Sequence, residues 1–191
     1  AEKNFNKLNS FGLNKFLITT EPKVNKFSHN VIFEALRNTD RRSKNNQSVT
    51  PGFLIAALLW PNLINRSLTK GEINLREFFR SMDPVLRNQQ KITAIPRKFH
   101  SYIKDIWILQ LKLHSRIGKQ PYKTLKHPRF RAAYDLMLIR EKCSCETKNL
   151  GKWWTDFQKN DDKLKKLLIS SLKEKDMQES FKTFGFSKEL I

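Results

Sequence analysis

The chain has 191 residues, 39% of them hydrophobic, which is enough for one sizeable core or for a core with a small appended bundle. Its 37 Lys and Arg residues outnumber its 18 Asp and Glu residues, so the formal net charge is +19. This excess favours a polyanionic partner, either a nucleic acid or an anionic membrane surface. No apolar run reaches the roughly 18 residues of a membrane-spanning helix, so we expect no transmembrane segment.

The spacing of the apolar residues predicts an all-α protein, an irregular multi-helix body of about seven to eight helices, because it is mostly helical and only six Gly and seven Pro occur. Residues 4–20 are expected to form a short helix and a turn, and residues 26–37 a helix that ends in a basic loop at 37–42. Thr50 and Pro51 are the N-cap and first-turn residues of an apolar helix over 53–60.

Further helices are expected in the second half of the chain. Pro61 closes or kinks the apolar helix, and a capped helix then runs over residues 69–92. The next helix begins near residue 99 and ends at Gly118, and residues 119–126 form a short link. The remaining expected helices cover 128–141, 147–158 and 162–175.

The last predicted helix is amphipathic and basic, with Asp161 and Asp162 capping its N-terminus. Its leucines are expected to pack on their own domain, although such a helix can also lie on a membrane or dock on a partner. We therefore divide the chain into a helical neck and body region over 1–116, an arginine-rich helical region over 117–160 and a basic amphipathic tail over 161–191.

The cysteines and the N-terminus bear on location and metal binding. Cys143 and Cys145 form a C-x-C pair, which suits neither a structural disulfide nor a zinc site without further ligands nearby. The N-terminus lacks the basic and apolar regions of a secretory signal. We therefore expect reduced thiols, no metal site and a cytoplasmic location.

Two clusters of cations are candidate sites for RNA. The first is the loop with Arg37, Arg41, Arg42 and Lys44, which could follow a phosphate backbone. An equally good interpretation is a salt-bridged helix terminus, because Asp40 lies within the cluster.

The second cluster combines cations with an aromatic ring that can stack on a base. It consists of Arg116, Lys119, Tyr122, Lys123, Lys126 and Arg129, and Arg97 near the start of the preceding helix completes the predicted RNA-binding set. Arg131 is excluded because its i, i+4 spacing from Asp135 indicates an ion pair within a helix.

The large apolar residues indicate the core. Trp60 and Trp107 are expected to be buried, as are Tyr134 and Met137. Adjacent helical residues point about 100° apart, so we expect one of Trp153 and Trp154 to be buried in the core and the other to be partly exposed.

Residues 127–140, with the sequence HPRFRAAYDLMLIR, and residues 153–158, WWTDFQ, resemble the arginine-rich C-terminal region of the bacterial poly(A) polymerase family. Other segments resemble the same family in the same order, so the resemblance runs from about residue 11 to residue 158. These segments are RNTD at 37–40, TPGF at 50–53, AALLWP at 56–61, IPRKF at 95–99 and DIWILQ at 105–110.

The resemblance implies an all-helical body that follows a nucleotidyltransferase head, which transfers AMP from ATP to an RNA 3′ hydroxyl using paired carboxylates and two Mg²⁺ ions. This sequence has no D-x-D or D-x-E motif and no Gly-rich phosphate loop, so we expect the chain itself not to catalyse adenylation. ATP and Mg²⁺ would belong to the head, present in cis or in trans. The chain would bind single-stranded RNA 3′ ends without strong sequence preference.

Three alternatives remain open. A relative that adds CCA to tRNA shares the head and differs in its tail domains. A stand-alone RNA- or protein-docking module would need no head. Peripheral membrane association through residues 162–175 would use the basic amphipathic helix.

Overall fold

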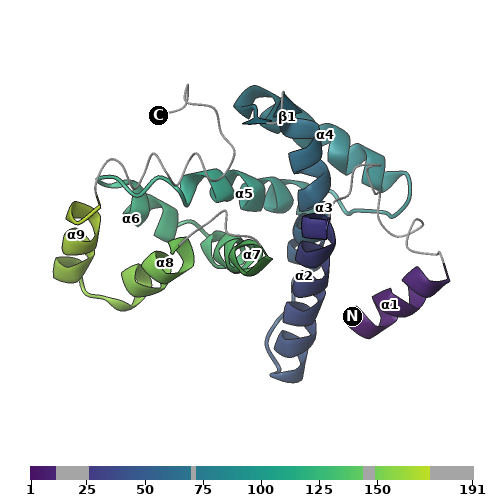
Figure 1. Ribbon diagram of the computed structural model, residues 1–191, viewed down its shortest axis with the longest axis horizontal. Helices are drawn as coiled ribbons and strands as arrows, with labels where there is room; N and C mark the ends of the chain where they lie inside the picture. Colours follow the sequence, from purple (N-terminus) through teal and green to yellow (C-terminus); the bar gives the residue numbers. More distant parts are fainter. Residues whose placement is uncertain (12–25, 70–71, 144–148, 173–191) are drawn as a thin grey trace. The chain divides into compact units, whose positions relative to one another are not determined.

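The computed structural model describes residues 1–11, 26–69, 72–143 and 149–172. The described residues are almost entirely helical, and their only strands form one short antiparallel pair, so the predicted all-α class is confirmed (Figure 1). The chain divides into two compact units, residues 1–104 and residues 105–191. The predicted boundaries after residues 116 and 160 stay predictions.

Unit 1 is organised around α3 (Pro51–Ser67), which packs against α2 (Lys26–Lys44) and α4 (Leu75–Gln90). α3 is apolar over most of its circumference, so burying it between two helices removes much apolar surface from water. Trp60 lies in this core, as predicted. α1 (Glu2–Ser10) packs on α2, where Phe5 meets Phe33 edge to face with ring centroids 5.8 Å apart.

The structure corrects the predicted helix boundaries on both sides of residue 68. α3 continues through Pro61, which is buried, so of the two predicted effects of this proline, closing or kinking the helix, closing is wrong. Residues around Thr69 do not start a helix: β1 (Leu68–Thr69) pairs with β2 (Glu72–Ile73). α4 begins later, and its N-cap is Asn74, whose side chain accepts a hydrogen bond from the backbone N–H of Glu77 at 3.1 Å.

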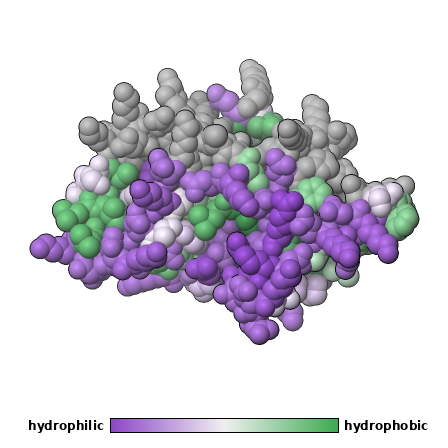
Figure 2. Space-filling model, turned by 60° about the horizontal axis from the view of Figure 1, so that its bottom comes forward, coloured by the Kyte–Doolittle hydropathy of each residue, from purple (hydrophilic) through white to green (hydrophobic). Residues whose placement is uncertain are grey.

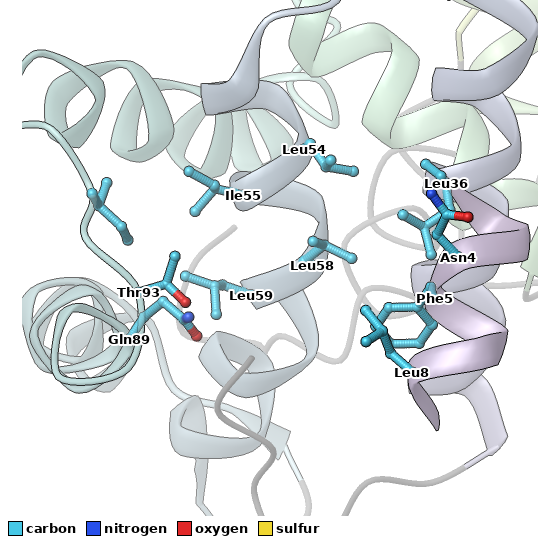
Figure 3. Close-up of a pocket in the computed structure, with 12 residues that line it drawn as sticks. Asn4, Phe5, Leu8, Leu36, Leu54, Ile55, Leu58, Leu59, Gln89 and Thr93 are labelled. Carbon is cyan, nitrogen blue, oxygen red and sulfur yellow. The ribbon is translucent and has the colours of Figure 1, made fainter. Parts of the chain in front are cut away.

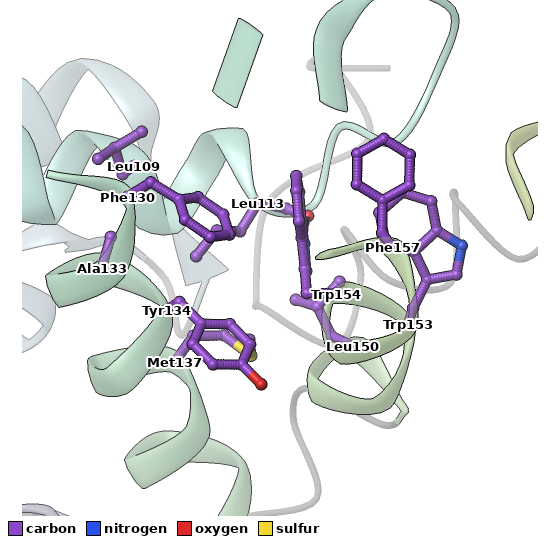
Figure 4. Close-up of a cluster of buried hydrophobic side chains, with 10 residues drawn as sticks. All are labelled: Leu109, Leu113, Phe130, Ala133, Tyr134, Met137, Leu150, Trp153, Trp154 and Phe157. Atoms are coloured by element: carbon purple, nitrogen blue, oxygen red, sulfur yellow. Dashed lines mark hydrogen bonds between the residues drawn. The ribbon is translucent and has the colours of Figure 1, made fainter. Parts of the chain in front are cut away.

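Unit 2 contains the last part of α5 (Lys98–Lys112), α6 (Gln120–Leu125), α7 (Phe130–Cys143), α8 (Leu150–Lys159) and α9 (Asp162–Ser170). Its core lies between α7 and α8 and includes residues at the end of α5 (Figure 4). The core cluster consists of Leu109, Leu113, Phe130, Ala133, Tyr134, Met137, Leu150, Trp153, Trp154 and Phe157. The predicted burial of Trp107, Tyr134 and Met137 is confirmed.

Trp153 and Trp154 are both buried, so the prediction that one of them is partly exposed is wrong. Figure 4 shows Trp154 between Phe130 of α7 and the Trp153–Phe157 pair of α8. Trp153 stacks on Phe157, with centroids 4.9 Å apart. The guanidinium of Arg116 also covers the Trp153 ring, with its carbon 5.5 Å from the ring centroid. Helical spacing in the sequence cannot reveal this contact, because Arg116 belongs to another segment.

Polar side chains tie the helices of unit 2 together. The buried Arg140 donates a hydrogen bond to Gln110 at 3.0 Å, and Gln110 donates in turn to the backbone oxygen of Ala133 at 2.9 Å. At the end of α7, the Glu141 carboxylate accepts hydrogen bonds from the backbone N–H of Gly151 at the start of α8. Burial raises the pKa of Glu141, and hydrogen bonds from the backbone N–H groups of Gly151 and Leu150 oppose that rise.

Candidate nucleic-acid interface

A groove in unit 2 brings together four lysines and one tyrosine from two helical regions far apart in the sequence. It has a volume of about 630 Å³, and we call it the α6–α9 groove. Its lining consists of Gly118, Lys119, Tyr122, Lys123, Lys126, Lys166, Ile169 and Ser170. Four of the residues predicted to bind RNA therefore lie in one groove.

One wall of the groove is α6 with its two flanking residues. Residues 119–126 are helical in their central part, so the prediction of a link without helix is wrong. Pro121 occupies the first turn, where its missing N–H costs nothing, and Gly118 adopts φ = 53°, a left-handed conformation that suits glycine. The steps of four and three residues between Lys119, Lys123 and Lys126 place them on one face.

The other wall comes from α9. Asp161 caps this helix, as predicted, and accepts a hydrogen bond from the backbone N–H of Leu164 at 2.8 Å. Leu168, Ile169 and Leu172 pack on the core cluster, which fixes the helix and directs Lys166 to the groove. Leu164 remains exposed, as does Leu167, so only part of the predicted packing of the α9 leucines is present.

The groove is strongly electropositive. Lys119, Lys123, Lys126 and Lys166 are all exposed, and no carboxylate occurs among the described residues that line the groove. At the start of α9, Asp162 lies 3.9 Å from Lys165, which is not one of the described lining residues. Within the described part of the chain, four positive charges surround one hollow without a lining carboxylate, which favours a ligand with several negative charges.

Tyr122 supplies an aromatic surface in the same groove. Its ring meets Phe157 edge to face, with centroids 5.3 Å apart, so packing fixes its orientation. Its hydroxyl is buried and has no hydrogen-bond partner among the described residues. Tyr122 and Ile169 supply the apolar part of the groove lining, alongside the four lysine side chains.

Two other members of the second cluster do not line the groove. Arg116 is only 6% exposed and its guanidinium lies over the Trp153 ring, so its side chain packs within unit 2, and its role as an RNA contact stays a prediction. Arg129 is half-buried, and its backbone N–H donates to Nδ1 of His127 at 3.1 Å. The ion pair predicted between Arg131 and Asp135 is present at 3.3 Å.

The first predicted cluster lies in unit 1 and is not a loop. α2 continues to Lys44, so residues 37–42 are helical, and the alternative of a salt-bridged helix terminus describes them better. Arg37 forms ion pairs with Glu2 at 2.8 Å and with Glu34 at 2.9 Å. Arg41 donates to Asn38 at 2.6 Å, and Arg42 donates to the backbone oxygen of Ser48 at 3.2 Å. Lys44 is exposed, as is Arg97.

Comparison with known proteins decides the family. A family model described as "Polymerase A arginine-rich C-terminus" matches residues 70–183, more than half of the chain. The chain belongs to this family. The matched region contains the whole α6–α9 groove, and the predicted resemblance to the bacterial poly(A) polymerase C-terminal region is confirmed.

Individual relatives agree with this assignment. Poly(A) polymerase I of Escherichia coli O6:H1 is 40% identical over 134 residues, which cover 67% of this chain and 29% of that protein. Poly(A) polymerase I of Salmonella typhi is 36% identical over the same length. That of Haemophilus influenzae is 34% identical over 152 residues, 77% of this chain and 34% of the relative. The chain thus spans about a third of the length of the curated relatives it matches.

Unit 1 holds a second hollow with a different character, lined mostly by residues that precede the matched region. Figure 3 shows leucine, isoleucine and phenylalanine side chains of α1, α2 and α3 around it, and its volume is about 280 Å³. Its lining contains no lysine or arginine, so it does not suit a polyanion. By contrast, hydrophilic residues cover most of the coloured surface on the face shown in Figure 2.

The described residues contain no group of three or more His, Cys, Asp and Glu that could hold a metal ion. Among the same residues, no helix has the length and apolar character needed to cross a bilayer.

Proposed function

We propose that this chain is the RNA-binding helical part of a poly(A) polymerase and that the α6–α9 groove binds single-stranded RNA near its 3′ end. The observation that carries the proposal is the convergence of Lys119, Lys123, Lys126 and Lys166 around one groove, whose described lining includes no carboxylate. The family supports the choice of RNA as the polyanion, because the curated relatives are poly(A) polymerases.

The chemistry of the groove suits a flexible phosphate backbone. Each lysine offers a compact, strongly hydrated ammonium that can approach a phosphate oxygen from several directions. Tyr122 and Ile169 can contact the faces of unstacked bases, which single-stranded RNA presents and a duplex does not. Such contacts are tolerant of sequence, because every base has a π-face.

The proposed division of labour leaves adenylate transfer to a nucleotidyltransferase head, in cis or in trans. ATP and Mg²⁺ would bind there, and this chain would hold cytoplasmic RNA so that its 3′ hydroxyl stays within reach. Holding the RNA raises the effective concentration of its end at the head without any new catalytic group.

The test is neutralisation of the four groove lysines as Lys119→Gln, Lys123→Gln, Lys126→Gln and Lys166→Gln. The matched control neutralises four exposed lysines that do not line the groove, as Lys3→Gln, Lys7→Gln, Lys152→Gln and Lys159→Gln. Both variants lower the net charge equally, so they separate position from total charge.

We expect the groove variant to lose most of its affinity for oligoadenylate at low salt. The slope of log K against log salt should fall by about 3, because each phosphate contact to a single strand contributes about 0.7. The control variant should keep nearly the slope of the unmodified chain. Equal losses in the two variants would contradict the proposal, as would an unmodified chain that does not bind oligoadenylate at low salt.

A further inference from the structure

A second set of cations lies in a row on the exposed face of α4 in unit 1. Arg76, Arg80, Arg87 and Lys91 follow one another at steps of four, seven and four residues and are all exposed. We call them the α4 cationic face. At 1.5 Å rise per residue the row is about 22 Å long. The opposite side of the helix, including Phe78, is buried in the core of unit 1.

The acids of α4 compensate only part of this charge, because Glu77 pairs with Arg80 alone. Glu77 bonds Arg80 at 3.0 Å, and Asp83 bonds Lys104 at 2.6 Å, so both carboxylates on the exposed side already have partners. Within the described residues, no carboxylate pairs with Arg76, Arg87 or Lys91, and the face keeps a net positive charge.

Helix stability does not explain the pattern. Arg76 and Arg80 form one like-charge i, i+4 pair, and Arg87 and Lys91 form another, and such pairs destabilise a helix. Arg76 also lies in the first turn, where the helix dipole disfavours a cation. Only the two cations near the C-terminus of α4 gain from the dipole. A ligand that binds the whole row would offset these unfavourable interactions.

An exposed aromatic ring lies beside the row. Phe79 is 45% exposed and follows Arg76 by three residues, so the two side chains are neighbours on the helix surface. The ring is held edge to face against the buried Phe78, with centroids 5.8 Å apart. A fixed, exposed ring next to guanidinium groups suits base stacking beside bound phosphates.

We propose that the α4 cationic face, with Phe79, is a second binding surface for single-stranded RNA, distinct from the α6–α9 groove. The arginines offer planar forks that match phosphate oxygens in pairs, and Phe79 stacks on one base. The choice of RNA as the ligand rests on the proposed function, whereas the location of this surface does not.

The test is a triple substitution, Arg76→Gln, Arg87→Gln and Lys91→Gln, with Phe79→Leu as a separate variant. Lys3→Gln, Lys7→Gln and Lys152→Gln together form the control with the same loss of charge. The assay measures binding of long and short oligoadenylate to the whole chain over a range of salt. Thermal unfolding of each variant shows whether the fold is retained.

We expect the triple variant to lose roughly tenfold or more in affinity for long oligoadenylate, with a slope lower by about 2, from three contacts of about 0.7 each. Its melting temperature should equal or exceed that of the unmodified chain, because the like-charge pairs are gone. Phe79→Leu should weaken single-strand binding roughly tenfold while leaving the salt slope unchanged.

Two results would overturn the inference. If the triple variant binds like its control while the groove variant loses binding, RNA binds through the groove alone and the proposed function stands. If Phe79→Leu and the triple variant both bind long oligoadenylate like the unmodified chain, the face does not contact RNA at all. Failure of the unmodified chain to bind would instead contradict the proposed function itself.

Discussion

Trp154 offers the sharpest test of how unit 2 is held together. Its side chain is fully buried between Phe130 and the Trp153–Phe157 pair. Its indole Nε1 donates a hydrogen bond to the backbone oxygen of Leu113 at 2.9 Å, which ties α8 to the end of the α5 segment. The substitution Trp154→Ala removes both the apolar contacts and this bond.

The magnitude follows from the burial. A tryptophan side chain buries about 150 to 250 Å², and at about 25 cal/mol per Å² this corresponds to about 4 to 6 kcal/mol. Measured Trp→Ala substitutions in cores cost about 3 to 5 kcal/mol. We therefore expect a loss of about 4 kcal/mol in the free energy of unfolding of unit 2. Trp154→Phe keeps most of the packing and should cost about 1 to 2 kcal/mol through the lost hydrogen bond.

Native-state amide hydrogen exchange of α7 and α8 measures the loss within unit 2 and does not depend on tryptophan fluorescence. Lys152→Ala, an exposed position of the same helix, is the control and should change the free energy by less than about 0.5 kcal/mol. If Trp154→Ala cost no more than Trp154→Phe, the packing of α8 on α7 would not be what stabilises unit 2, and the reasoning would be refuted.

Two further substitutions test the role of Arg116 and the raised pKa of Glu141. Arg116→Ala should destabilise unit 2 by about 2 kcal/mol, because its guanidinium covers Trp153, yet leave the salt slope of RNA binding unchanged. A lower slope at unchanged stability would return Arg116 to the RNA contacts. The pKa of Glu141 is raised in the folded chain above its usual 4.5, so its contribution to stability is full below that pH and is lost as pH rises through the folded value. Glu141→Gln should therefore gain stability relative to the unmodified chain as pH rises above the usual pKa of 4.5, and a difference that is constant with pH would contradict this assignment.

The sequence predicted the helical class and several caps because these depend on local chemistry. Asp161 precedes an amphipathic run and is the N-cap of α9, and Arg131 pairs with Asp135 at the spacing that a helix brings together. Residues 37–42 were harder to predict, because polar and charged residues are compatible with a loop. α2 continues through them, and Arg37 pairs there with Glu2 and Glu34.

The site could be predicted only in part, for a physical reason. Lys119, Tyr122, Lys123 and Lys126 are close in sequence, so a basic cluster with an aromatic residue was visible. Lys166 is forty residues further along, and nothing in its local sequence shows that packing of Leu168 and Leu172 turns it to the same groove. Residue spacing also could not show that Arg116 differs from the other cations of its cluster, because only tertiary packing places it over Trp153.

By itself, the sequence of this chain determined its family, its helical class and its strong positive charge. The family follows from motifs and the helical class from periodicity, which are properties of neighbouring residues. The charge follows from the composition of the whole chain. Only the tertiary structure decided which cations are available to a ligand. Burial and ion pairing depend on residues far apart in the chain, and they occupy Arg116 and Arg37 while leaving four lysines around one groove and a row of cations on α4.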